Sequence, residues 1–261
     1  MLTMGSGTAK YVKTKENIDD MRQGGHILAN ILTKLRGMIK PGLDVWALEQ
    51  AFSELCEANK VTPSCKGYDP FDGFPFPTGL CVSINSQCVH CFPKKGVILK
   101  EGDLVTIDTA IKYKGFHTDS AFAVGVGKIA KKDQILLDTA KKALDESISL
   151  ISDDTKVGKV SNKIQKTLEQ AGFNVLQDYV GHGIGKEMHE WPYVPGYGNK
   201  NDGPKLKSGM TICVEILACT GDPTVVNTTV WETKMKDDGK WVQFEHTILV
   251  KDSGYEILTL A

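Results

Sequence analysis

The sequence predicts an α+β fold built from two similar halves. The prediction rests on two observations. Segments with apolar residues at helical spacing are followed by strand-like runs, and the order helix, helix, loop, strands occurs twice along the chain. The 261 residues are 41% hydrophobic and 24% charged, which is enough apolar material for a substantial core. No linker divides the chain, so we expect a flexible extension at residues 1–14 and a single domain at residues 15–261.

Two helices open the first half. Apolar side chains recur at helical spacing between residues 15 and 38, and Pro41-Gly42 ends that helix. Asp44 is suited to cap a second helix, which has Leu55 among its inward residues. The chain then enters a turn-rich, aromatic loop at residues 67–79. Three strand-like runs complete this half, at residues 80–86, 103–111 and 118–126.

The second half repeats this order. Helical spacing returns at residues 131–151 and 160–170, and Gly172 ends the latter segment. A glycine-rich loop is expected at residues 181–185. Strand-like runs follow at residues 210–217, 241–250 and 255–260. The halves share no obvious repeat of residues, so the recurrence of element order alone indicates that they are related.

The composition excludes several functional classes. A net charge of −1 provides no basic field for nucleic acid. No apolar run approaches ~18 residues, so no membrane span is expected. Residues 1–7 lack the basic and apolar regions of a signal peptide. Seven cysteines without a secretion signal favour reduced thiols and a cytoplasmic location. Cys88-Val89-His90-Cys91 resembles half of a zinc knuckle, but no second pair has the required spacing, so no structural zinc is expected.

Two aspartates flank a predicted hairpin turn at residues 112–115. With a two-residue loop at Tyr113-Lys114, Asp108 and Asp119 would lie directly opposite each other on one face. Opposed residues of this kind have Cβ atoms ~4.5–5.5 Å apart. Two negative charges at that separation repel each other unless a cation lies between them. On the hairpin alone, two solvated strand carboxylates remain the alternative.

Two glutamates occupy strand-like runs in which a charge is unexpected. Glu215 lies in the apolar run 210–219, where a buried carboxylate requires a metal or another cation. Glu245 shares one face of its strand with Gln243 and Thr247, and its burial there without a partner would be costly. Both glutamates are therefore candidate ligands.

His182 is the remaining candidate ligand. It lies between Gly181 and Gly183, which would let backbone or ligand approach closely. Taken alone it is better explained as a loop histidine, and Gly-His-Gly-Ile-Gly lacks the spacing of a dinucleotide fingerprint. Four carboxylates and one imidazole suit Mn²⁺, Fe²⁺, Co²⁺ or Zn²⁺. The set predicts a binuclear metal site with hydrolytic chemistry.

Together these motifs resemble the type I methionine aminopeptidases. The resemblance extends from about residue 15 to the end of the chain. It implies the pita-bread fold, in which two pseudo-symmetric α+β halves surround a central antiparallel sheet. It also implies removal of the N-terminal methionine from nascent proteins and peptides with a small second residue. The motifs that carry it lie at residues 82–85, 89–90, 102–108, 115–119, 181–185, 188–190 and 243–248.

The resemblance assigns a role to each ligand. Asp108 would bind one metal, and Asp119 and Glu245 would bridge both. His182 and Glu215 would complete the site of the other metal. Metal coordination lowers the pKa of the attacking water, and Glu215 is the implied general base.

The resemblance also implies a substrate site. His189 would bond the substrate and stabilise the developing oxyanion, and His90 would contact the substrate backbone near the scissile bond. A core histidine with satisfied hydrogen bonds is the alternative for each. The methionine side chain would enter an apolar pocket. The residues implied to form it are Cys65, Tyr68, Cys81 and Trp231, with Met188 where the family often has Phe.

The sequence departs from the family at three places. Residues 67–81 form a longer segment than usual, which leaves open whether Phe71, Phe74 or neither fills the pocket. Cys91 stands where Gly is usual, which would alter the preceding turn. Ile216 stands where Pro is usual, which affects the local backbone but not the neighbouring ligand.

Two other functions remain open. An Xaa-Pro aminopeptidase or prolidase would share the fold, but usually carries a large extra N-terminal domain, and roughly 100 residues precede Asp108. Type II methionine enzymes have a helical insert for which the 33 residues from His182 to Glu215 leave no room. A non-catalytic binding relative would lack ligands, and none is missing. We expect a monomer that acts on N-terminal methionine peptides and nascent chains. The ribosome is a further candidate partner, and neither nucleic acid nor membrane is recognised directly.

Overall fold

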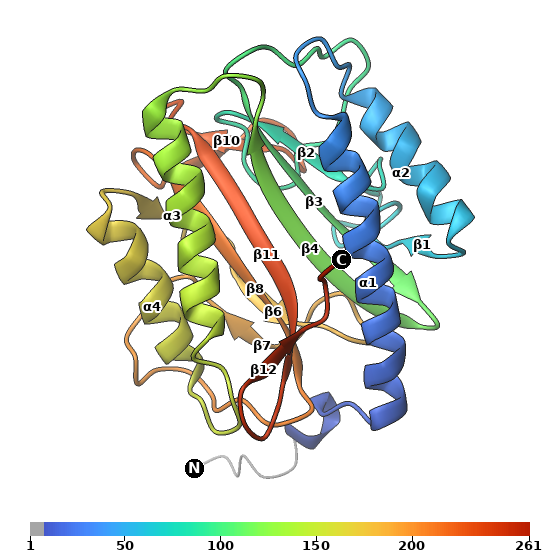
Figure 1. Cartoon of the computed structure of the whole chain (residues 1–261), viewed down its shortest axis with the longest axis vertical. Coiled ribbons are helices and arrows are strands. Elements are labelled where there is room, and N and C mark those ends of the chain that lie inside the picture. The colour runs from blue at the N-terminus through green and yellow to red at the C-terminus, as the bar shows by residue number, and fades with distance from the viewer. Residues whose placement is uncertain (1–7) are drawn as a thin grey trace.

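A ten-stranded sheet runs through the middle of the molecule, and helices lie in front of it (Figure 1). The computed structural model describes residues 8–261. Residues 1–7, on which the expectation of no signal peptide rests, lie outside the described residues. No helix of the described part is long and apolar enough to cross a membrane.

The first half contains two helices and four strands, as the sequence predicts in outline. They are α1 (Lys15–Met38), α2 (Trp46–Ala58), β1 (Thr62–Pro63), β2 (Cys81–Ile84), β3 (Leu104–Tyr113) and β4 (Phe116–Gly125). Thr14 caps α1, because its hydroxyl accepts a hydrogen bond from the Asn17 N–H at 3.3 Å. Val45 rather than Asp44 occupies the cap position of α2. The Asp44 carboxylate nevertheless accepts a hydrogen bond from the Trp46 N–H at 3.0 Å.

The hairpin between β3 and β4 turns one residue later than predicted. Tyr113 pairs with Phe116, so the two-residue loop is Lys114-Gly115, and both loop residues have positive φ, at 47° and 89°. A type I′ hairpin loop requires that conformation, and glycine adopts it freely. Asp108 is therefore paired with Ala121, not with Asp119. The aspartates lie diagonally, two residues out of register, but still on one face of the sheet.

The second half follows the predicted order but contains five short strands that the sequence did not predict. Residues 181–183, expected as part of a loop, form a short strand. Its glycines allow close backbone contact, since a Cβ atom on Gly181 would lie 2.4 Å from the Cys213 carbonyl oxygen. The elements are α3 (Lys131–Ile148), α4 (Val157–Gln170), β5 (Asn174–Val175), β6 (Gly181–Gly183), β7 (Glu190–Val194), β8 (Thr211–Cys219), β9 (Val225–Asn227), β10 (Thr233–Met235), β11 (Trp241–Val250) and β12 (Tyr255–Ile257).

The two halves meet in the centre of the sheet, where β4 pairs with β11. The strand order is β1, β3, β4, β11, β8, β6, β7, and β2, β5 and β12 attach to β3, β8 and β11. Helix α1 packs on β3 and β4, and α3 packs on β8 and β11, from the same side (Figure 1). One cluster of buried apolar side chains continues through both halves, including Leu28, Phe52, Ile107, Leu136 and Ile216. The expected α+β architecture of two halves is confirmed.

Part of the expected N-terminal extension packs on the second half. Thr8–Tyr11 forms a 3₁₀ helix, and the Tyr11 and Trp191 rings lie 5.4 Å apart. The Lys13 N–H donates to the Gly209 carbonyl at 2.8 Å. These contacts connect the segment before α1 with the strand β7, which follows the predicted substrate histidine 189.

Candidate metal centre and catalytic site

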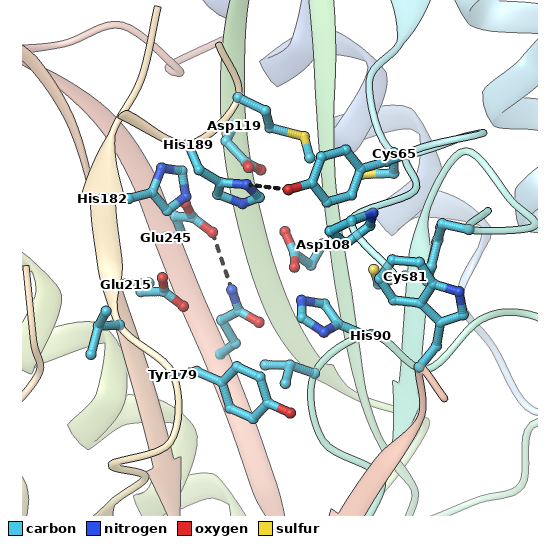
Figure 2. Close-up of a pocket in the computed structure, with 18 of the residues that line it drawn as sticks. Cys65, Cys81, His90, Asp108, Asp119, Tyr179, His182, His189, Glu215 and Glu245 are labelled. Atoms are coloured by element: carbon cyan, nitrogen blue, oxygen red, sulfur yellow. Dashed lines mark hydrogen bonds between the residues drawn. The ribbon is translucent and has the colours of Figure 1, made fainter. Parts of the chain in front are cut away.

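A cavity of about 390 Å³ opens on the sheet face opposite α1 and α3. Asp119 and Glu245 line it, whereas their neighbours Ser120 and His246 point to the helix side, as strand alternation requires. Figure 2 shows the side chains converging on the cavity. All the site residues predicted from the sequence line it: Cys65, Tyr68, Cys81, His90, Asp108, Asp119, His182, Met188, His189, Glu215, Trp231 and Glu245.

Four neighbouring strands deliver the four carboxylates. Asp108 and Asp119 come from the β3–β4 hairpin, and Glu245 comes from β11 beside it. Glu215 on β8 is directly paired with Glu245. Gln243, two residues before Glu245 and on the same face, donates a hydrogen bond to the Glu245 carboxylate at 3.1 Å. The sheet register therefore explains how residues far apart in sequence share one site.

The described part of the protein supplies no cation that would stabilise the charged form of these carboxylates. Burial raises the pKa of Asp119 to about 7, and burial together with the Asp119 charge raises the pKa of Glu215 to about 8. Burial and the neighbouring carboxylates also raise the pKa of Asp108 and of Glu245 well above the ordinary range. Among the described residues, none of these four carboxylates forms a salt bridge with Lys or Arg. One oxygen each of Asp119 and Glu245 is buried without a hydrogen-bond partner.

These observations test whether divalent ions fit the site. Buried carboxylates without partners are costly, and a divalent ion removes both the repulsion and the unmet hydrogen-bonding capacity. One ligand atom each from Asp119, His182, Glu245 and Cys213 lies within 4.8 Å of the others. The donor set therefore fits a metal.

His182 is oriented to offer one nitrogen to a metal. Its Nδ1 lies 2.8 Å from the Gly183 carbonyl oxygen, which can only accept a hydrogen bond. The proton is therefore on Nδ1, and Nε2 keeps its lone pair for coordination. Burial, with a smaller contribution from His189, lowers the pKa of His182 to about 3, so the ring is neutral. A neutral imidazole is the form that binds metals.

Cys213 belongs to this cluster, and the sequence prediction missed it. The thiol is fully buried on β8, opposite Thr247, and lies 3.7 Å from the Thr247 hydroxyl. Strand periodicity could have found it, because Cys213 precedes Glu215 by two residues and therefore shares its face.

His189 and His90 lie at the cavity without joining the metal cluster. The His189 Nδ1 lies 3.3 Å from the Tyr68 hydroxyl, and its ring centroid lies 4.5 Å from that of His182. Burial lowers the pKa of His189, and burial followed by the charge of His189 lowers the pKa of His90 to about 4. The His90 ring meets Tyr179 and Trp231 edge to face. Both histidines are neutral near pH 7.

The long loop turns Phe71 and Phe76, but not the Phe74 ring, toward the apolar end of the cavity. Phe71 and Phe76 line the cavity, whereas Phe74 contributes its carbonyl oxygen, which accepts a hydrogen bond from the Trp231 indole at 2.9 Å. Phe76 is 4% exposed and packs edge to face on Trp231 at 5.1 Å. The sequence prediction missed Phe76 because the loop length did not indicate which aromatic side chain turns inward.

The backbone conformation tolerates Cys91 and Ile216, the two other residues that differ from the family pattern. Cys91 is buried, and its thiol donates to the Thr233 carbonyl at 3.3 Å. The positive φ of this turn, 61°, falls on His90 and not on Cys91, so a side chain at 91 is tolerated. Ile216 is fully buried in β8 and pairs with Phe244, which continues the ladder past Glu215.

Comparison with known proteins identifies the family. A model of metallopeptidase family M24 matches residues 19–252. The chain belongs to this family. Its members are metal-dependent peptide hydrolases, in agreement with the buried carboxylate and imidazole cluster.

Relatives within family M24 match nearly the whole chain. A methionine aminopeptidase of Mycoplasma capricolum is 38% identical over 95% of this chain and 97% of its own length. A methionine aminopeptidase of Escherichia coli is 32% identical over 95% of this chain and 93% of its own length. A crystal structure of a Thermotoga maritima methionine aminopeptidase has a TM-score of 0.92, with 36% identity, covering 96% of this chain and 99% of that one.

More distant solved structures share the fold. A prolidase of Pyrococcus furiosus has a TM-score of 0.74 at 20% identity, and covers 97% of this chain but 66% of its own. The pita-bread fold expected from the sequence is confirmed by these likenesses.

Proposed function

We propose that this M24 peptidase removes the N-terminal methionine from peptides and nascent proteins whose second residue is small. One observation carries the proposal. The predicted ligands, the two further histidines and an apolar cup all line one cavity, and its buried carboxylates lack a neutralising cation. The nearly full-length likeness to methionine aminopeptidases supports the same activity.

The chain would hold two divalent ions of the Mn, Fe, Co or Zn type. The residues that would hold them are Asp108, Asp119, His182, Glu215 and Glu245, which all line the cavity. When bound, such ions polarise a carbonyl and lower the pKa of water. Gln243 holds the Glu245 carboxylate in orientation through its 3.1 Å hydrogen bond.

Protein side chains would move the proton and position the substrate. Glu215 faces the cavity and would take the proton of the attacking water. Donation from the Tyr68 hydroxyl to His189 Nδ1 leaves Nε2 protonated, and this N–H can stabilise the developing oxyanion. His90, which lies across the cavity from Glu215 (Figure 2), would contact the substrate backbone near the scissile bond.

An apolar cup would receive the methionine side chain. Its walls combine two thiols with aromatic rings, which suits an unbranched thioether. Such a cup discriminates by shape, at ~1–3 kcal/mol per misplaced methylene. The residues that would form it are Cys65, Tyr68, Phe76, Cys81 and Trp231.

The test is release of free amino acid from a set of tripeptides. We expect the protein to cleave Met-Ala-Ser and Met-Gly-Ser, and to leave Leu-Ala-Ser, Met-Lys-Ser and Met-Phe-Ser largely intact. Chelation should stop cleavage, and Mn²⁺ or Co²⁺ should restore it. Cleavage of Xaa-Pro peptides without methionine would instead support the prolidase alternative. Full activity of metal-free protein would contradict the mechanism.

We also propose that the protein acts as a monomer in the cytoplasm, on chains emerging from the ribosome, and that residues 15–261 fold as one domain. All seven cysteines are free thiols, which supports a reducing compartment. The continuous apolar core supports one domain. Sedimentation of the protein alone and with ribosomes would test the assembly state and the partner. Limited proteolysis would test the domain boundary, with one stable fragment starting near residue 15 or earlier as the expected result.

A further inference from the structure

Exposed aromatic side chains gather at the mouth of the catalytic cavity. Phe71 and Tyr193 line the cavity, yet they are 51% and 65% exposed. Phe74 is 53% exposed, and its backbone is bonded to Trp231 at the same mouth. Exposed apolar groups that adjoin one another mark interaction sites more often than isolated ones do. We call these side chains the aromatic rim: Tyr68, Phe71, Phe74, Tyr193 and Trp231.

Hydrogen bonds hold the shape of the loop that carries three of the five residues of the aromatic rim. The Asp69 carboxylate accepts hydrogen bonds from the N–H groups of Phe71, Gly73 and Phe74, at 3.3, 2.8 and 3.2 Å. The Phe76 N–H donates to the Tyr68 carbonyl at 2.8 Å and closes the base of the loop. Preorganisation of this kind lowers the entropy lost when a ligand binds. The loop therefore presents its phenylalanines to solvent in a defined arrangement.

Trp231 joins this loop to the methionine cup. On its inner side it meets buried Phe76, with ring centroids 5.1 Å apart. On its outer side it meets half-exposed Phe71 edge to face at 4.9 Å. The inner side of Trp231 is thus already packed, and the outer surface of Phe71 remains available to an apolar partner.

Tyr193 lines the cavity from a different element, β7. In β7 its neighbours Pro192 and Val194 are buried, so strand alternation turns the Tyr193 ring outward. The aromatic rim thus comes from three segments far apart in sequence: the long loop, β7 and the segment that carries Trp231.

We propose that the aromatic rim binds the third and fourth residues of the substrate, and favours apolar or aromatic side chains there. This inference rests on the proposed function, because the methionine in the cup sets the direction of the peptide. An extended peptide advances ~3.3 Å per residue, so its third residue lies ~7 Å beyond its first. Since Tyr68 and Trp231 belong to both the cup and the rim, the outer side chains Phe71, Phe74 and Tyr193 lie where those later residues leave the cavity.

The experiment compares two tetrapeptide amides, Met-Ala-Phe-Leu and Met-Ala-Ser-Ser. With the metal-loaded full chain, we expect kcat/KM to be about fivefold higher for the apolar peptide, because part of the aromatic surface leaves water on binding. The difference should lie mainly in KM. Phe74→Ser and Tyr193→Ser should each move the ratio of the two kcat/KM values toward one. Ile135→Ser provides the control, because it removes a 44% exposed apolar side chain of α3, away from the cavity, and should keep the wild-type ratio.

Each outcome decides the inference. Equal kcat/KM for the two peptides with wild-type protein would overturn the proposed role of the rim but leave methionine removal in place. This comparison does not depend on whether the variants fold. A wild-type ratio retained in both rim variants also overturns that role. Failure to release methionine from either peptide overturns the proposed function together with the rim. A ratio that falls in the rim variants and persists in the Ile135 variant supports it.

Discussion

Lys13 and Glu190 form an ion pair that ties the segment before α1 to the residue following His189. The Lys13 Nζ lies 2.7 Å from the Glu190 carboxylate, and the two side chains are only 7% and 11% exposed. The other Glu190 oxygen accepts the Glu187 N–H at 3.2 Å, which closes the turn before His189. A buried pair of this kind is weak evidence for net stability, but breaking one partner is costly.

Lys13→Met should therefore lower both the stability and the turnover number. Removing the cation leaves the Glu190 carboxylate buried and unpaired, at a cost of ~3–5 kcal/mol in the free energy of unfolding. His189 should lose its orientation, so kcat should fall more than KM rises. Urea unfolding and steady-state kinetics measure the two effects. Lys205→Met is the matched control, since that lysine pairs with Asp154 at the surface with side chains 53% and 52% exposed. Equal effects of the two variants would contradict the positioning role.

The local sequence predicted most of this site, because strand alternation and short motifs identify which side chains share a face. The predicted hairpin loop was wrong by one residue, which shifts the pairing of the two strands by two residues. Two neighbouring pairs, Tyr113-Lys114 and Lys114-Gly115, could form its loop, and the preference of glycine for positive φ selects the second.

Contacts between distant segments could not be predicted from the local pattern. The strand at Gly181–Gly183 forms because its glycines permit close approach to Cys213 and to the carbonyl of Trp191, which the local sequence does not show. Lys13 and Glu190 are 177 residues apart, so the sequence around either residue does not predict the ion pair. Phe76 turns inward and packs against Phe92 and Trp231, which come from other segments.

His189→Ala should retain metal and lose turnover. The ring contacts Tyr68 and faces His182, and we assign it to the substrate rather than to a metal. Removing one donor to a developing oxyanion costs ~10²–10³-fold in kcat. Metal analysis of the purified variant should give the wild-type stoichiometry. His26→Ala, at an exposed position of α1, should change neither quantity. Loss of metal from the His189 variant would make this residue a ligand.

The free energy of unfolding of metal-free protein should fall as the pH rises. The folded-state pKa values of Asp119 and Glu215, about 7 and about 8, lie above their ordinary values of 3.8 and 4.5. Groups shifted in this direction contribute stability that is complete below about pH 4 and is lost as the pH rises through those folded-state values. Divalent ions favour the charged carboxylates, so they should cancel the loss.

Thermal unfolding measures this linkage. Chelator-treated protein should have a lower Tm at about pH 8 than at about pH 5, and Mn²⁺ should raise the Tm more at the higher pH. A metal-free protein whose Tm does not change between these values would show that the carboxylates are neutralised by something other than a bound ion.

Glu215→Gln should reduce turnover by ~10²-fold or more, because it replaces the proposed general base with an amide of the same shape. The substitution also removes a buried carboxylate, paired directly with Glu245 on β11, whose ionisation costs stability in metal-free protein as the pH approaches its pKa of about 8. We therefore expect the metal-free variant to unfold at a higher temperature than metal-free wild type, even though it is the less active enzyme. Glu57→Gln, at an exposed position of α2, is the control and should alter neither property. Wild-type turnover in the Glu215 variant would place the base elsewhere. A lower Tm in its metal-free form would show that the buried carboxylate of Glu215 does not destabilise the metal-free protein.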